Sequence, residues 1–277
     1  MKSRLILKFA STIMLLIFAV SVNAQTYKNT NFSGNLYLGM SNMMGDLGGS
    51  NFIGSRGLMD YDFRSNRLAG GLGFTMHTGG SFSFGINFLA TRLYGDDAFS
   101  EQDFQEERNL CVRTDLLEGD FLIEYRPFSR SSGFNRFYVY SGVGIMYYQP
   151  KAELNDDWYK LRTLGTEGQY LDNGPGPYKE LQVVVPYGLG YKFRLAKSTS
   201  IILDLGFRKT FTDYLDDVSG NYPNLALLEE VNPIASQLSF RSPEILPQLA
   251  GNPVGKPRGN PDDKDGYFIG NITFSFN

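Results

Sequence analysis

The chain has 277 residues, a formal net charge of −3 and a single cysteine. This acidic balance argues against a nucleic-acid-binding protein, which needs a basic surface to neutralise phosphates. One cysteine cannot form an internal disulfide, so a disulfide-stapled scaffold is excluded as well.

The first 24 residues have the features of a secretory signal. Three basic residues lie within the first eight positions, and a mostly apolar stretch runs from Phe9 to Val22. The small residue Ala24 completes a cleavage site of the usual kind. The apolar stretch is too short to favour the alternative, a transmembrane anchor. We therefore predict a signal peptide at residues 1–24 and one exported domain at residues 25–277.

Beyond residue 24, the sequence contains segments in which apolar or aromatic side chains alternate with small or polar ones. A period of two is typical of β-strands, and no apolar run here is long enough for a membrane helix. We predict eight strands, near residues 35–43, 67–77, 82–90, 117–125, 137–147, 181–193, 201–208 and 266–276.

The hairpin formed by segments 181–193 and 201–208 shows the pattern most clearly. Its apolar face is broad and ends in aromatic residues, whereas its other face carries glycines and charges of both signs. In a soluble sheet the polar face meets water, but a membrane barrel turns its apolar face to lipid and encloses the polar one. Pro186 lies within this hairpin and cannot donate a ladder hydrogen bond, so we expect a bulge or kink there.

The connections between the segments alternate between long and short, as in outer-membrane barrels with short periplasmic turns and long outer loops. Aromatic residues also gather near both ends of the segments, like interfacial girdles. A soluble lipocalin-like barrel explains the alternation but neither of these regularities. The sequence therefore predicts an all-β fold, an eight-stranded antiparallel transmembrane β-barrel in the outer membrane of a Gram-negative bacterium, with both termini periplasmic. The long loops fall near 44–66, 95–112, 150–179 and 214–265, and the short turns near 78–80, 127–135 and 195–199.

Several charged residues belong to the face that such a barrel encloses. The interior of an eight-stranded barrel is just filled by side chains, so we expect these charges to pair as an ion-pair plug. A narrow conduction path is the alternative. The set comprises Glu118, Asp120, Glu124, Lys192, Arg194, Asp204 and Arg208.

We predict no catalytic residue, no cofactor and no metal. Aspartate pairs occur in the long loops, at 96–97, 156–157, 216–217 and 262–263. Calcium favours such oxygen ligands, but none of the pairs has the full EF-hand spacing, so we expect solvated loop acids. The only histidine, His77, lies beside a short turn. A lipid-modifying enzyme would place a histidine next to a serine or aspartate at the opposite, outer end.

Six stretches carry a resemblance to a known family: Gly45–Gly49, Tyr94–Ala98, Tyr147–Ala152, Leu164–Gln169, Arg208–Ser219 and Arg258–Pro261. On these residues the chain resembles the PorG-like family of Bacteroidota outer-membrane β-barrels, which includes a component of the type IX secretion system. The tract at 208–219 is the most specific of the six. The loop positions that match are Gly45, Asp46, Gly48, Gly49, Asp96, Asp97, Thr166, Glu167, Thr210, Asp213, Tyr214, Asp216 and Asp217.

The resemblance implies a non-enzymatic outer-membrane component of the type IX protein secretion machinery. It also implies contact with a periplasmic ring built from a lipoprotein and its soluble partner. The longest short turn carries Arg126 and Arg130 and is the contact we expect on that side. The alternative is a small barrel of the OmpA or OmpX type, structural or ligand-binding, with no secretion partner.

Overall fold

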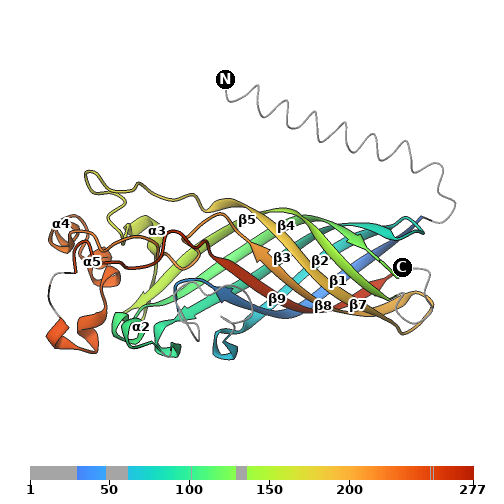
Figure 1. The fold of residues 1–277 in the computed structure, drawn as a ribbon, viewed down its shortest axis with the longest axis horizontal. Coiled ribbons are helices and arrows are strands. Elements are labelled where there is room, and N and C mark those ends of the chain that lie inside the picture. Colours follow the sequence, from blue (N-terminus) through green and yellow to red (C-terminus); the bar gives the residue numbers. More distant parts are fainter. Residues whose placement is uncertain (1–29, 48–61, 101, 129–135, 250, 252) are drawn as a thin grey trace, which may run out of the picture.

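In the computed structural model, the chain forms a closed antiparallel β-barrel (Figure 1). The structure describes residues 30–47, 62–100, 102–128, 136–249, 251 and 253–277. The predicted signal peptide, Gly48, Gly49 and Arg130 lie outside these residues. Within them, no helix has the length and apolar character needed to cross a membrane.

Eight of the strands in the described chain form the barrel wall. Each pairs with the next in antiparallel fashion, and the first pairs with the last, so that the sheet closes. The prediction of an eight-stranded antiparallel barrel is confirmed. The wall strands are β1 (Asn31–Met44), β2 (Arg67–His77), β3 (Phe82–Asp96), β4 (Cys111–Tyr125), β5 (Phe137–Leu154), β7 (Leu181–Arg194), β8 (Thr199–Lys209) and β9 (Gly266–Phe276). A short strand, β6 (Asp157–Lys160), pairs only with the end of β5.

Strands β3, β4 and β5 run further than the sequence pattern indicates. The predicted segments ended near 90, began near 117 and ended near 147, whereas these strands continue to Asp96, Cys111 and Leu154. In the added stretches the enclosed side chains include Leu93 and Val112, which are buried and apolar. The outward side chains of these stretches include Arg92, Arg113 and Glu153. The polarity of the two faces is therefore inverted there, and the membrane-type pattern ends although the strands go on.

Pro186 interrupts the β5–β7 ladder but adds no bulge. The paired residues Ser141 and Tyr187 lie on one side of the gap, and Gly144 and Val184 on the other, in the same register. A bulge requires an extra residue on one strand, so this part of the expectation was wrong. The Ser141 hydroxyl donates a hydrogen bond to the Pro186 carbonyl (3.2 Å) and bridges the two strands inside the gap.

The outer wall of the barrel is apolar all the way round. Each wall strand exposes large apolar side chains, and the exposed fraction reaches 80% at Leu68 and 70% at Phe74. The alternate positions point inward, so the predicted assignment of the two faces agrees with the burial pattern. Aromatic rings pair near the short turns, as in Phe82 with Tyr125 (centroids 5.1 Å apart), and nearer the long loops, as in Tyr187 with Phe207 (5.8 Å).

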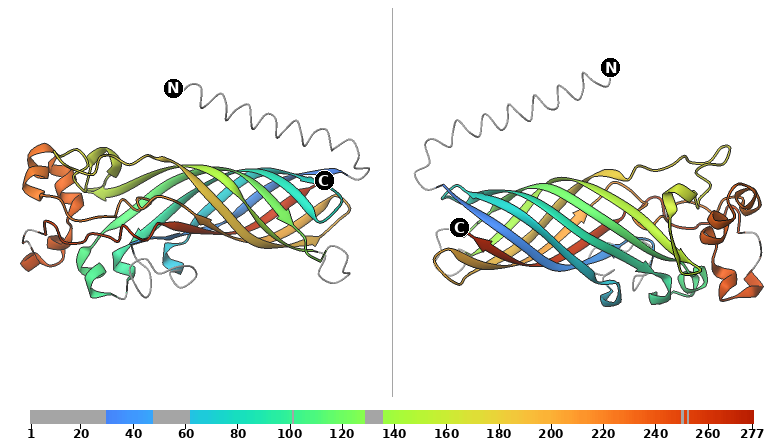
Figure 2. Two further views of the ribbon diagram at one scale, coloured as in Figure 1. Left: turned by 45° about the horizontal axis from the view of Figure 1, so that its top comes forward. Right: turned by 180° about the vertical axis from the view of Figure 1, so that it is seen from behind.

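The two ends of the barrel differ in the way predicted. All four long connections lie at one end, and the short turns lie at the other, where β1 begins and β9 ends (Figures 1 and 2). We call the four long connections, residues 45–66, 97–110, 155–180 and 210–265, the loop cap. Its helices are η2 (Phe63–Ser65), η3 (Asp97–Phe99), α2 (Asp103–Arg108), α3 (Leu161–Leu164), α4 (Leu225–Val231), α5 (Pro233–Ser239), η4 (Ser242–Glu244) and η5 (Pro247–Leu249).

Candidate functional site: a sealed loop cap and an open basic vestibule

The middle of the lumen contains one ion pair. Arg208 Nε lies 3.4 Å from Glu118 Oε1, and the other Glu118 oxygen accepts a hydrogen bond from the Tyr267 hydroxyl at 2.7 Å. All three side chains are buried. Because a buried charge is costly unless it is paired and hydrogen-bonded, this arrangement fixes three strands of the wall to one another.

Two of the other predicted lumen acids, Asp204 and Asp120, have neutral partners. Asp204 accepts hydrogen bonds from the hydroxyls of Tyr138 (2.6 Å) and Tyr140 (2.7 Å), and Asp120 accepts one from Asn87 (2.7 Å). Within the described residues, Glu118–Arg208 is the one ion pair of the predicted set. The expected plug therefore consists mostly of acid–tyrosine and acid–amide contacts. Sequence reasoning did not assign these tyrosines a role, although their places on the inward face of β5 could have suggested one.

The lumen is nearly filled at this level. The void between these side chains measures about 40 Å³. Closer to the loop cap, a layer of buried apolar side chains follows, which includes Leu116, Met146, Val184 and Ile269. The polar plug and the apolar layer together separate the loop end of the barrel from the short-turn end.

Arg108, the last residue of α2, ties three loops of the cap together. Its guanidinium forms two bonds to the Asp97 carboxylate, Nε to Oδ2 at 2.7 Å and Nη2 to Oδ1 at 2.6 Å. It also donates to the backbone carbonyls of Arg258 and Asp46, each at 2.6 Å. Arg108 and Asp97 are both buried, so this is a bidentate pair with its remaining donors satisfied.

Arg258 is the second buried arginine of the cap. Its Nη1 lies 3.0 Å from Glu167 Oε1 and donates to the Asp217 carbonyl at 2.5 Å, while its Nε donates to the Ser239 carbonyl at 3.2 Å. Glu167 also accepts hydrogen bonds from the backbone N–H of Ser219 (2.9 Å). Between them, the two arginines join all four long loops.

Two aspartates, Asp216 and Asp265, flank the backbone of Gly45. Asp216 Oδ2 accepts hydrogen bonds from the N–H groups of Asp46 (2.9 Å) and Leu47 (3.1 Å), and Asp265 Oδ2 accepts one from Leu215 (2.8 Å). A Cβ on Gly45 would lie 2.8 Å from Asp265 and 2.9 Å from Asp216, so a side chain there does not fit. Burial raises the pKa of Asp46 to about 7. Burial, followed by the neighbouring carboxylates, raises the pKa values of Asp216 and Asp265 well above the usual range.

Other motif residues complete the interior of the cap. Asp217 accepts hydrogen bonds from the hydroxyls of Thr166 and Tyr178, the latter at 2.6 Å. The ring of Tyr178 stacks on Tyr214, with centroids 4.5 Å apart, and the Thr210 hydroxyl donates to the Asp265 carbonyl at 2.6 Å.

Asp96 and Asp213 occupy different settings. Asp96 caps η3 by accepting a hydrogen bond from the Ala98 N–H at 3.0 Å. Asp213 is buried, and burial raises its pKa to about 6.

The expectation of solvated loop acids was wrong for three of the motif aspartates. Asp97, Asp216 and Asp217 are buried, because arginines, hydroxyls and backbone N–H groups of the cap replace their water. The expectation agrees with the structure for Asp156 and Asp157, which are exposed. Among the described residues, no group of three histidine, cysteine, aspartate or glutamate side chains is arranged to hold a metal ion.

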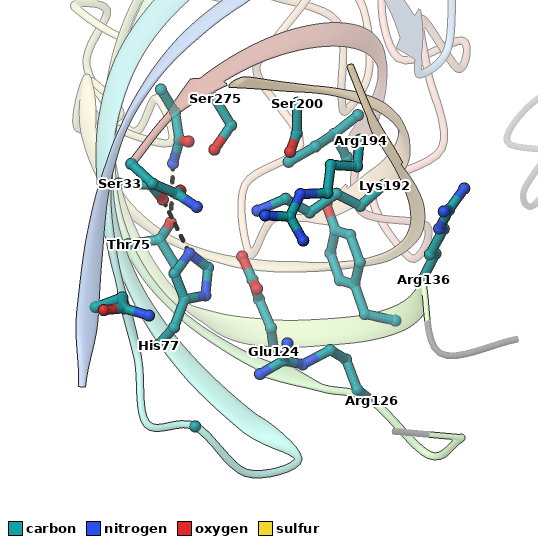
Figure 3. A pocket seen from close by; sticks show the side chains of 16 residues that line it. Ser33, Thr75, His77, Glu124, Arg126, Arg136, Lys192, Arg194, Ser200 and Ser275 are labelled. Carbon is teal, nitrogen blue, oxygen red and sulfur yellow. Dashed lines mark hydrogen bonds between the residues drawn. The ribbon is translucent and has the colours of Figure 1, made fainter. Parts of the chain in front are cut away.

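The short-turn end of the barrel holds an open cavity of about 450 Å³, which we call the vestibule (Figure 3). Four cationic side chains line it, together with one acid, Glu124. Lys192 and Arg194 come from the end of β7, Arg126 follows β4, and Arg136 precedes β5. Glu124 and Lys192, both predicted to face the lumen, line this cavity together. The Glu124 carboxylate and the Lys192 ammonium do not form an ion pair within 4 Å.

His77 also lines the vestibule, where its ring lies inside the barrel and not at the outer surface. Its Nε2 lies 3.0 Å from the Ser33 hydroxyl, and its Nδ1 lies 3.0 Å from the Ser83 hydroxyl. Both ring nitrogens are therefore occupied. The arrangement fixes the ring orientation, and in the neutral ring one nitrogen donates to a serine hydroxyl while the other accepts from one.

Comparisons with known proteins give a limited result. No family model and no curated protein matches the sequence. Among solved structures, the chain is similar to Ail, the attachment invasion locus protein of Yersinia pestis, in complex with sucrose octasulfate (10% identity, 89% of this chain, 99% of that chain, TM-score 0.38). It is similar to Neisserial surface protein A (6% identity, 90% of this chain, 99% of that chain, TM-score 0.37). It is also similar to a major outer membrane protein from Thermus thermophilus (12% identity, 89% of this chain, 99% of that chain, TM-score 0.36). At these scores the likeness carries no argument, and the barrel fold rests on the strand pairing described above.

Proposed function

We propose that the chain is an integral outer-membrane protein whose barrel serves as an anchor for the loop cap. The observation that carries this proposal is the apolar outer wall. Burying one large apolar side chain is worth about 1.5–3 kcal/mol, and every strand of the wall exposes several of them. Such a wall is stable in a bilayer, whereas in water it would drive aggregation.

Fractionation tests this location. We expect the folded chain in the outer-membrane fraction, resistant to carbonate washing and extracted only by detergent. In gel electrophoresis the unboiled protein should migrate differently from the boiled protein. A folded protein recovered from the periplasm or medium without detergent would overturn the proposal.

The barrel is proposed to work without an open pore and without catalysis. The plug around Arg208 and Glu118 leaves little free volume, and the apolar layer follows it. The vestibule then opens to the periplasm and the loop cap faces outward, as expected when short turns are periplasmic.

The finer proposal is a role in type IX protein secretion, in contact with the periplasmic ring lipoprotein and its soluble partner. Its support is the sequence resemblance, and several residues that carry the resemblance lie in the hydrogen-bond network of the cap. Deletion of the gene should then abolish secretion of proteins that bear the type IX signal. Normal secretion in the deletion strain would favour the alternative, an OmpA- or OmpX-like barrel that is structural or binds ligands through its loops.

The turn after β4 is the proposed contact with the ring. Arg126 begins this turn, and its Nη2 donates to the Gly80 carbonyl at 2.8 Å. We expect Arg126→Glu with Arg130→Glu to reduce co-purification of ring proteins. The control is Arg241→Glu in the loop cap, at the other end of the barrel. Equal recovery with both proteins would count against the contact.

A further inference from the structure

We propose that the vestibule is a binding site for an oxyanion ligand of the phosphate class that enters from the short-turn end. The four cationic side chains that line it face a single acid, Glu124. A cavity with low-dielectric walls and one excess sign of charge concentrates ions of the opposite sign. The inference is independent of the secretion role.

Two of the vestibule cations have hydrogen-bond donors without an acceptor in the described chain. Within the described residues, no hydrogen bond or ion pair engages the Lys192 ammonium. The buried Arg126 Nε likewise has no acceptor, because the hydrogen bonds of this side chain to Gly80 and Ser83 use Nη2. Free guanidinium and ammonium donors in one cavity suit phosphate oxygens, which accept several charge-assisted hydrogen bonds at once.

The uncharged side chains that line the vestibule also favour an anion. The hydroxyl of Ser275 is buried and has no partner in the described chain, and Ser200 faces the same cavity (Figure 3). Small hydroxyl groups can donate to an anion without adding charge or bulk. The guanidinium of Arg194 is oriented by the carbonyls of its own turn, Ala196 and Lys197, each at 3.2 Å, so its charge stays at the mouth.

The arginines of the loop cap provide the contrast. Arg108 and Arg258 use their donors on Asp97, Glu167 and backbone carbonyls, and so have a structural role. Within the described residues, the vestibule cations have no carboxylate at ion-pair distance, although Arg126 and Arg194 donate to backbone carbonyls. The cavity volume of about 450 Å³ lies within the range of small-molecule sites, roughly 300–1,000 Å³. It therefore suits a phosphorylated compound or a phosphate-bearing headgroup better than a single inorganic phosphate.

Calorimetry with sodium pyrophosphate tests the proposal on the full mature chain in nanodiscs of zwitterionic phosphatidylcholine. The wild-type protein should bind, and binding should weaken in high salt because the attraction is screened. Lys192→Gln should weaken binding about tenfold or more, the usual effect of losing a charged hydrogen-bond donor. The matched control is Lys151→Gln, whose ammonium lies 2.6 Å from Asp115 at the opposite end of the barrel.

Each outcome decides the proposal. Absence of binding to the wild-type protein, or equal binding by Lys192→Gln and Lys151→Gln, would overturn it. If Lys192→Gln does not fold, the exposed rim residue Arg136 supplies a second variant, Arg136→Gln, with the same expected loss. Nanodiscs with anionic phosphatidylglycerol separate the two sources of the ligand. Pyrophosphate binding that is lost there identifies a lipid headgroup as the occupant, and unchanged binding identifies a soluble phosphate compound.

Discussion

Replacement of Arg258 by methionine should open the loop cap while the barrel stays folded. Arg258 and Glu167 lie 3.0 Å apart, with side chains 1% and 2% exposed. Methionine fills most of the space of the arginine stem but leaves the glutamate charge buried without its partner. Removing one partner of a buried pair costs about 3–5 kcal/mol. Since about 1.4 kcal/mol is a factor of ten, the equilibrium for local opening should rise on the order of 10²–10³-fold.

Thermolysin digestion of the folded protein in detergent measures this opening, because cleavage in loops follows the population of the open form. The unboiled gel mobility reports the barrel in the same samples. Arg241→Met is the control, since the side chains of Arg241 and Glu244 are 18% and 41% exposed and solvent-accessible pairs contribute about 0–1 kcal/mol. Glu167→Gln combined with Arg258→Met should recover part of the protection, because it removes the unpaired charge. If Arg258→Met resists digestion as well as Arg241→Met does, the buried pair does not hold the cap closed.

Three further predictions concern the wall, the cap and the lumen. Leu72→Arg places a charge on the outward face of β2 and should destabilise the barrel in lipid by about 2–4 kcal/mol. The control, Leu227→Arg on the exposed side of α4, should fold normally. Refolding yields in vesicles compare the two variants, and equal yields would contradict a lipid-facing wall. The cap should be digested more slowly at pH 5 than at pH 8. The pKa of Asp46 in the folded state is raised to about 7 from its usual 3.8, so its stabilising effect is complete below about pH 4 and is lost as the pH rises through about 7. Asp46→Asn should flatten this dependence, and an unchanged profile would exclude Asp46 as its origin. In planar bilayers the protein should carry no steady current, and a stable single-channel conductance would show that the plug is permeable.

The wall was predictable from the sequence because each strand presents two different environments. Strands β2, β7 and β9 begin and end within one residue of the predicted segments, since apolar and polar or small positions alternate along most of their length. Where β4 extends under the cap, Val112 and Leu116 face an apolar interior, while the outward positions include Arg113 and Asp115. The alternation is inverted there relative to the lipid-facing part of the strand, so a search for apolar outward positions misses it. The polarity of the barrel interior at each level therefore decides whether a strand shows the pattern of apolar outward and polar inward side chains.

The loop cap was not predictable in the same way. Asp46, Glu167 and Arg258 are far apart in the sequence, and nothing local distinguishes a loop aspartate in water from one that accepts backbone hydrogen bonds. The structure buries them because four loops rise from one rim and can supply donors to one another. Glycines are the local signal, since the backbone of Gly45 passes between two carboxylates and that of Gly259 passes against Asp46, where a Cβ does not fit.

The two ends of the barrel use charged side chains in opposite ways, and this difference sets the direction from which a ligand can arrive. In the cap, the donors of Arg108 and Arg258 are used internally, so removing an arginine should cost stability. In the vestibule, Lys192 and the Arg126 Nε have no internal acceptor in the described chain, so a charge removed there should cost affinity. Because the plug around Glu118 and Arg208 separates the two ends, an anion that reaches the vestibule must come from the side of the short turns. A functional effect of Lys192→Gln should therefore depend on the composition of the compartment on that side and be insensitive to the outer medium.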